Sequence, residues 1–202
     1  MSTKHERLEK AAKLEKSGKW QEMLILCEEW ALEEPQDPNA LLGLGNSLRK
    51  LGNPAEAILM YLRGLEMAHL LVDDSTRGFY NAAPLWYQLG HAYNESGSLH
   101  KAAEAFLEAA SIDPNAEDIW NDLGVIYINM TPRDPKAAFD AFSKAFDLDP
   151  KNVNTLKNLG VVYAMCDSEQ GVRQIFQKLS NVDTKVAENF LLQAKEILSN
   201  HK

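Results

Sequence analysis

The side chains that most often carry chemistry do not stand at catalytic or metal-binding spacings in this sequence. Its two cysteines, Cys27 and Cys166, lie far apart, without a Cys-x-x-Cys motif and without a histidine at ligand spacing. The histidines form no i, i+4 pair that would hold a metal ion on one helix face: His5, His69, His91, His100 and His201. The Gly-x-Gly motif at 43–45 lies in a helical pattern without a preceding strand, which argues against a dinucleotide site. We therefore expect no enzymatic activity, no metal and no cofactor.

Composition and charge are those of an ordinary globular protein, and they limit its partners. Hydrophobic residues make up 45% of the 202 residues and charged residues 25%, which argues against disorder. The net charge of −8 repels phosphate backbones, so we expect no nucleic-acid partner. The charged N-terminal stretch lacks an apolar signal segment, and no apolar run approaches a membrane span. We expect a cytoplasmic protein with no membrane partner, whose two thiols are buried in a reducing compartment.

Two stretches that begin 34 residues apart place the same residue types at the same spacing. Trp, Leu, Gly and Tyr recur at i, i+3, i+4 and i+7, on one helical face: Trp86, Leu89, Gly90, Tyr93 and Trp120, Leu123, Gly124, Tyr127. A second amphipathic segment follows each, with Ala, Phe, Ala and a closing Pro: Ala102, Phe106, Ala109, Pro114 and Ala138, Phe142, Ala145, Pro150. Each unit is predicted to be a pair of antiparallel helices. The later unit is longer at the turn MTPRDP, where two prolines are expected to forbid helix.

The glycine of this pattern has a predicted packing role. A glycine inside a helix costs about 1 kcal/mol relative to alanine, so its presence needs a reason. We expect it where two helix backbones approach too closely for a Cβ atom, with the small alanines of the second helix at the same contact. Because one helical hairpin cannot bury its apolar face alone, such hairpins are expected to stack.

These units resemble the tetratricopeptide repeat (TPR) family, with W-x-x-L-G-x-x-Y in the first helix and A-x-x-x-F-x-x-A followed by P in the second. The resemblance implies an all-α fold, a right-handed α-solenoid that forms a single domain over 1–202. In the family register the repeats are 4–37, 38–71, 83–116, 117–152 and 153–186. The apolar stripe of 185–200 is predicted to form a helix that caps the last repeat.

The outer repeats match the family pattern less closely than the middle ones. In the first repeat Ala11 stands at the glycine place and Cys27 at the phenylalanine place, so Cys27 is predicted to be a core residue. In the last repeat the second helix carries Val172, Phe176 and Leu179 at the Ala, Phe and Ala places. Terminal repeats are expected to be atypical because one of their sides faces solvent.

The segment 72–82 exceeds the repeat period, and two interpretations of it stay open. In the first, the preceding helix extends past Leu71, and Phe79 and Tyr80 pack back on the stacked helices. In the second, the segment is a loop at the rim of a groove and contacts a partner, as its Asp, Ser and Gly residues favour.

The family resemblance also implies where a partner binds. In TPR proteins the first helices line a concave groove, and the residues that flank the core stripe face it: Asn46, Arg49, Tyr87, Gln88, His91, Asn94, Asn121, Asp122, Lys157 and Asn158. Amides suit the backbone of an extended peptide because each donates and accepts at once. The groove is predicted to be basic near Arg49 and acidic near Asp122, with cations of the partner opposite the fourth repeat. Asp118 and Asp122 stand where chaperone-binding TPR proteins have cations, which argues against a carboxylate clamp.

The function that this resemblance implies is a non-enzymatic protein–protein interaction module. It would bind an extended or helical peptide segment of a protein partner in the groove and serve as an adaptor, co-chaperone or assembly factor. The alternative is a self-associating structural scaffold, a homo-oligomer, or an accessory subunit of a larger complex. The choice among these roles stays open because a fold does not determine its function.

Overall fold

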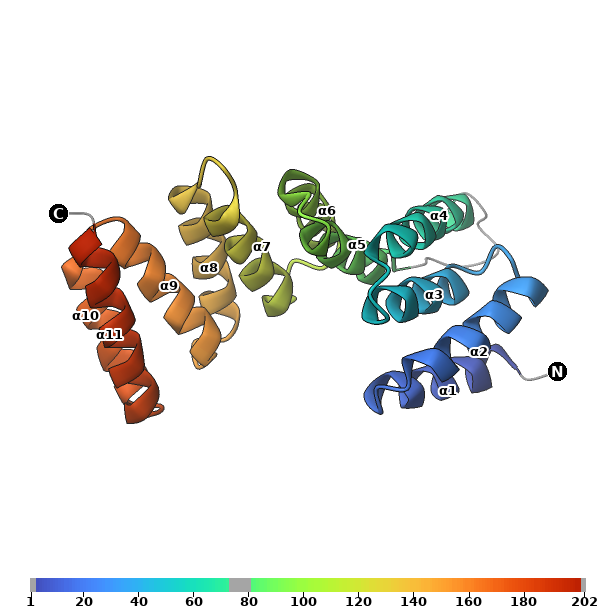
Figure 1. The fold of residues 1–202 in the computed structure, drawn as a ribbon, viewed down its shortest axis with the longest axis horizontal. Coiled ribbons are helices and arrows are strands. Elements are labelled where there is room, and N and C mark those ends of the chain that lie inside the picture. Colours follow the sequence, from blue (N-terminus) through green and yellow to red (C-terminus); the bar gives the residue numbers. More distant parts are fainter. Residues whose placement is uncertain (1–2, 73–80, 201–202) are drawn as a thin grey trace. The chain divides into compact units, whose positions relative to one another are not determined.

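The computed structural model describes residues 3–72 and 81–200, and the described residues form eleven helices and no strand (Figure 1). The helices are α1 (Lys4–Lys16), α2 (Trp20–Glu33), α3 (Pro38–Lys50), α4 (Pro54–Val72), α5 (Ala83–Glu95), α6 (Leu99–Ile112), α7 (Glu117–Asn129), α8 (Pro135–Leu148), α9 (Val153–Met165), α10 (Glu169–Ser180) and α11 (Thr184–Asn200). Each predicted repeat holds two of them, and α11 lies where a capping helix is predicted; that it caps the last repeat stays a prediction. The all-α prediction is confirmed.

Contacts between Cα atoms group the chain into two compact units, Met1–Asp113 and Pro114–Lys202. The first unit contains α1 to α6 and the second contains α7 to α11, so the boundary falls between whole hairpins. That 1–202 forms a single domain stays a prediction. In the 72–82 segment α4 continues past Leu71 to Val72, whereas residues 73–80, with Phe79 and Tyr80, lie outside the described residues.

Local sequence signals explain where the helices begin and end. Asp37 and Asn152 cap α3 and α9 by accepting hydrogen bonds from backbone N–H groups of the first turn. The turn inside each of the first three repeats places a glycine at positive φ, as in Gly97 at 78°. In the MTPRDP turn only Pro132 precedes the helix, because Pro135 is the first residue of α8, where proline is well tolerated. The prediction that both prolines forbid helix is therefore wrong for Pro135.

The first-helix glycines of the middle repeats make room for an aromatic ring. A Cβ atom on Gly90 would lie 2.7 Å from Phe106 Cε1, and one on Gly124 would lie 2.6 Å from Phe142 Cε1. The Tyr61 ring occupies the same place over Gly45 in the second repeat. The three rings are buried. The prediction that glycine separates two backbones is therefore wrong, because the neighbour is a side chain of the second helix.

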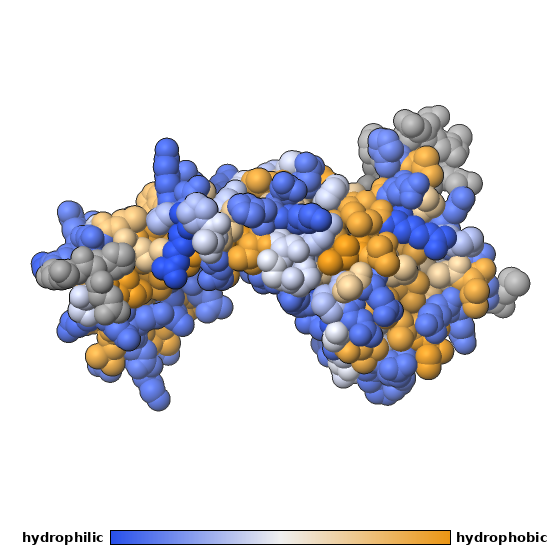
Figure 2. Space-filling view, turned by 45° about the horizontal axis from the view of Figure 1, so that its top comes forward, coloured by the Kyte–Doolittle hydropathy of each residue, from blue (hydrophilic) through white to orange (hydrophobic). Residues whose placement is uncertain are grey.

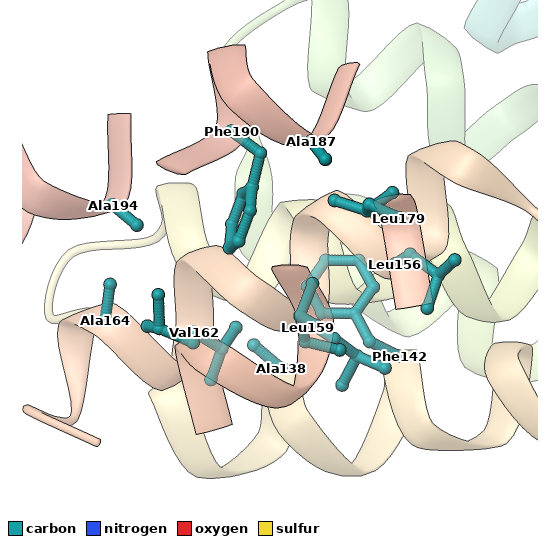
Figure 3. Close-up of a cluster of buried hydrophobic side chains, with 12 residues drawn as sticks. Ala138, Phe142, Leu156, Leu159, Val162, Ala164, Leu179, Ala187, Phe190 and Ala194 are labelled. Atoms are coloured by element: carbon teal, nitrogen blue, oxygen red, sulfur yellow. The ribbon is translucent and has the colours of Figure 1, made fainter. Parts of the chain in front are cut away.

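The last repeat fills this place from a different helix. The ring of Phe190 on α11 lies over Gly160, and Figure 3 shows it pointing from α11 into the buried cluster that includes Leu159 and Val162. Phe176, which the family register predicts for this place, is only half-buried. The Tyr163 ring packs on Gly171, at the start of α10. Helix α10 buries Val172, Ile175 and Leu179 in the cluster. Phe176 lies at the edge of the cluster.

The two cysteines differ in their surroundings. Cys27 is fully buried on α2, which confirms that it is a core residue. Burial, with a smaller contribution from the negative charge of Glu15, raises the pKa of its thiol to about 12. Cys166 is exposed, at the end of α9, so the prediction that both thiols are buried is wrong for Cys166.

We expect the free energy of unfolding to fall as the pH rises above about 9, the ordinary pKa of the Cys27 thiol. The unfolded chain loses this proton near pH 9, whereas the folded chain keeps it until about pH 12, so alkaline pH favours unfolding. One such group contributes up to about 1.4 kcal/mol per pH unit in this window. Burial also raises the pKa of Tyr61, which adds an effect of the same sign at higher pH.

Chemical denaturation between pH 8 and pH 10.5 would measure this dependence. The Cys27→Ala variant should show a smaller loss of stability per pH unit, whereas Cys166→Ala should keep the native slope. Equal slopes in the native protein and in Cys27→Ala would contradict the assignment to Cys27.

Among the described residues, no helix is both long enough and apolar enough to cross a membrane.

Candidate functional site

In the first unit the candidate residue Arg49 connects the first helices of two consecutive repeats. Its guanidinium on α3 donates a hydrogen bond to Gln88 Oε1 on α5 at 2.9 Å and forms an ion pair with Glu95. Only 8% of the Arg49 side chain is exposed. Its positive charge is therefore neutralised inside the protein, and Arg49 adds little of the basic character that the sequence predicts for this region.

Asn46, also on α3, is directed into the interior of the first unit. It accepts a hydrogen bond from the Tyr61 hydroxyl at 2.9 Å and donates one to Glu15 Oε1 at 3.3 Å. The residue is 7% exposed. Since Tyr61 is buried, its hydroxyl needs such an acceptor, and Asn46 supplies it. This pairing connects α3 with α4 and α1.

Two aromatic candidates lie together on α5. The Tyr87 and His91 rings meet edge to face, with their centroids 4.6 Å apart. Both also contact the Phe106 ring of α6, at 5.7 and 5.3 Å between centroids. Tyr87 and His91 are half-buried, and Asn94, at the end of the same helix, is exposed. With the Arg49–Gln88 pair beside them, these residues form a partly exposed surface of amide and aromatic groups on α5.

In the second unit two candidate asparagines pair directly. Asn158 Nδ2 on α9 donates to Asn121 Oδ1 on α7 at 3.0 Å, and both residues are half-buried. The hydroxyl of the buried Thr155 lies within hydrogen-bond distance of the same Asn121 oxygen, at 3.4 Å. The other two candidates, Asp122 on α7 and Lys157 on α9, are half-buried on the same two helices. The polar contacts thus fix the spacing of α7 and α9.

Glu117, at the start of α7, joins this polar cluster although the sequence reasoning did not select it. Its carboxylate accepts hydrogen bonds from the Thr155 hydroxyl and from Asn152 Nδ2, the latter at 3.0 Å. Burial raises the pKa of Glu117, against the lowering effect of the Thr155 hydrogen bond. The sequence did contain a signal for Glu117: it stands four residues before Asn121, and residues i and i+4 share a helix face.

The candidate residues fall on both units. Asn46, Arg49, Tyr87, Gln88, His91 and Asn94 belong to the first, and Asn121, Asp122, Lys157 and Asn158 belong to the second. Within each unit they lie on the first helices of consecutive repeats. That one groove joins the two sets stays a prediction. Over residues 3–72 and 81–200, no three His, Cys, Asp or Glu side chains gather as metal ligands would.

Comparisons with known proteins match two segments of the chain to family models. Residues 40–71 match the model described as tetratricopeptide repeat, and residues 90–130 match the model described as TPR repeat. The first segment lies on α3 and α4, and the second runs from the middle of α5 through α6 to the end of α7. No curated protein sequence matches the chain.

Solved structures share the fold along most of the chain. A MamA crystal structure is 19% identical, with a TM-score of 0.71, and the match covers 90% of this chain and 92% of the MamA chain. YrrB, described as a TPR protein with an unusual peptide-binding site, is 20% identical with a TM-score of 0.69. The match covers 92% of this chain and 88% of the YrrB chain. MamA of Desulfovibrio magneticus RS-1 is 19% identical with a TM-score of 0.67, and the match covers 97% of this chain and 94% of that MamA chain. The matched segments show that the chain is a member of the tetratricopeptide repeat family, and the solved structures show that it shares their α-solenoid fold.

Proposed function

We propose that the chain is a non-enzymatic protein–protein interaction module that binds an extended segment of a partner protein along its first helices. Tetratricopeptide repeats are interaction modules, and YrrB is described as having a peptide-binding site. In the first unit the binding helices would be α3 and α5, and in the second α7 and α9. An adaptor or assembly factor is the role that such an activity serves.

The paired amides of Asn121 and Asn158 carry this proposal. Their mutual hydrogen bond uses Asn121 Oδ1 and Asn158 Nδ2. Asn121 Nδ2 and Asn158 Oδ1 have no partner among the described residues. The half-buried pair thus presents one donor and one acceptor side by side. A peptide group offers one C=O and one N–H, so an extended backbone complements this pair.

Other side chains on the first helices of each unit suggest what a partner segment carries. On α5 the half-buried Tyr87 and His91 rings offer apolar area to a partner side chain. On α7 Asp118 is exposed beside Glu117, and these neighbouring carboxyls favour a cation. A partner segment with an apolar residue therefore suits the α5 surface of the first unit, and one with a basic residue suits the α7 surface of the second unit.

Selection from a phage-displayed library of random peptides on the native protein would test the proposal. The selected peptides should lose about 30-fold in affinity for the Asn121→Ala/Asn158→Ala variant, because two hydrogen bonds of about 1 kcal/mol each disappear. The control is Gln170→Ala/Gln177→Ala, which removes two exposed amides from α10, a second helix of the same unit. Equal affinity for the native protein and the asparagine variant would contradict the proposal.

A self-associating scaffold is the second candidate, and the exposed apolar side chains of α2 and α4 favour it. Ile25 and Leu32 lie seven residues apart on one side of α2 and are 50% and 84% exposed. Leu59 and Leu62 on α4 are 60% and 41% exposed. A dimer that persists when the protein is diluted during size measurement would favour this candidate over the peptide-binding module.

A further inference from the structure

A pocket of about 340 Å³ lies in the second unit, where the start of α8 meets the end of α9. Its lining comes from α8, from α9 and from the turn that follows α9: Pro135, Lys136, Phe139, Val162, Tyr163, Cys166 and Ser168. None of the candidate residues for peptide binding lines it. It is therefore a separate site from the Asn121–Asn158 pair.

The walls of this pocket suit an aromatic or branched apolar group. The Phe139 and Tyr163 rings meet edge to face, with centroids 5.5 Å apart, and both remain half-buried. A further ring placed against them would find the same favourable edge-to-face geometry. The volume lies near the lower end of the range of about 300–1,000 Å³ for ligand pockets, which is room for one large side chain.

One positive charge stands at the pocket. Lys136 is the only charged residue of the lining, and it forms no ion pair among the residues that the structure describes. Two acidic neighbours have partners of their own. Asp134 accepts a hydrogen bond from Ala137 N at 2.9 Å, and Glu169 pairs with Arg173 at 3.4 Å. Asp167 lies in the turn between two lining residues but does not itself line the pocket.

We propose that this pocket binds an aromatic or branched apolar side chain of a partner protein, and that an acidic residue next to that side chain pairs with Lys136. The apolar walls supply the binding energy, and the lysine selects the charge of the neighbouring residue. This second contact lies outside the α7 and α9 amide surface and does not depend on it.

Alkylation of Cys166 by iodoacetamide gives a direct readout, because this exposed thiol lines the pocket whereas Cys27 is fully buried. The probes are acetyl-Phe-Glu-amide and acetyl-Phe-Lys-amide at millimolar concentration. We expect the Phe-Glu probe to slow the alkylation about threefold at twice its dissociation constant, and the Phe-Lys probe to slow it less. The rate of each variant is compared with its own rate without peptide.

Two charge-reversal variants of α8 make the test specific. Lys136→Glu should shift the preference toward the Phe-Lys probe by about fivefold, as expected for a partly exposed ion pair. Lys144→Glu, an exposed position on the same helix that does not line the pocket, should behave as the native protein does. Equal slowing by both probes, no slowing by either, or an unchanged preference in Lys136→Glu would overturn the proposal. Asn121→Ala/Asn158→Ala should keep the native response, which separates this site from the proposed function.

Discussion

Replacement of Phe190 by alanine is expected to lower the free energy of unfolding of the second unit by about 3–5 kcal/mol, the usual cost for a fully buried phenylalanine. The Phe190 side chain is 1% exposed and lies over Gly160, in the place that second-helix rings occupy in the middle repeats. Its removal leaves a cavity among α9, α10 and α11. The capping helix is thus expected to be an integral part of the core.

Phe176→Ala is the matched control, because it removes the same side chain from α10. Phe176 is half-buried, and burial energy scales with the apolar area removed from water, so we expect less than half the effect of Phe190→Ala. Urea unfolding followed by circular dichroism, with separate transitions fitted for the two units, would measure both changes. A larger loss in Phe176→Ala than in Phe190→Ala would mean that the register predicted by the family pattern is correct after all.

Gly124→Ala is expected to destabilise the second unit by about 1–3 kcal/mol, the typical cost of overpacking a core. On helix propensity alone the change would stabilise α7 by about 1 kcal/mol, so the two effects have opposite signs. The new Cβ atom would lie 2.6 Å from Phe142 Cε1, and this ring is buried on all sides. Overpacking should therefore outweigh propensity.

A double-mutant cycle with Phe142→Leu tests whether the ring is the cause. The smaller leucine leaves space for the Cβ atom, so Gly124→Ala should cost less in the Phe142→Leu background than in the native protein. The free energy of unfolding of the four proteins would be compared by urea denaturation. Stabilisation by Gly124→Ala, or an equal cost in both backgrounds, would show that the ring does not set the requirement for glycine.

The helices and their pairing were predictable because the signals are local. A 3.6-residue apolar period, a capping Asp37 or Asn152 and a turn glycine such as Gly97 act within a few residues of one another. Two helices of the structure fall within each predicted repeat and α11 falls on 185–200, whereas the division of the chain into five repeats and a cap stays a prediction. The buried Cys27 was also predictable, because it stands at a core place of the repeat pattern.

The surroundings of the candidate site were only partly predictable. The repeat register placed Arg49 and Gln88 on first helices, as observed, but it did not indicate that they pair with each other and with Glu95. It selected Asn121 and Asn158 but not Thr155 or Glu117, which complete their hydrogen-bond cluster. Each of these contacts joins residues more than 30 positions apart, and their geometry depends on how one helix is rotated against the next.

The sequence by itself determined the helical hairpins, their order and the residue types of their core. Only the tertiary structure decided which side chain fills each space, as when Phe190 of α11 replaces Phe176 of α10 over Gly160. It also decided that Arg49 is neutralised and that Phe139, Tyr163 and Lys136 surround one pocket. The physical reason is that helix formation depends on neighbours within about one turn, whereas packing depends on the relative rotation of helices that are distant in sequence.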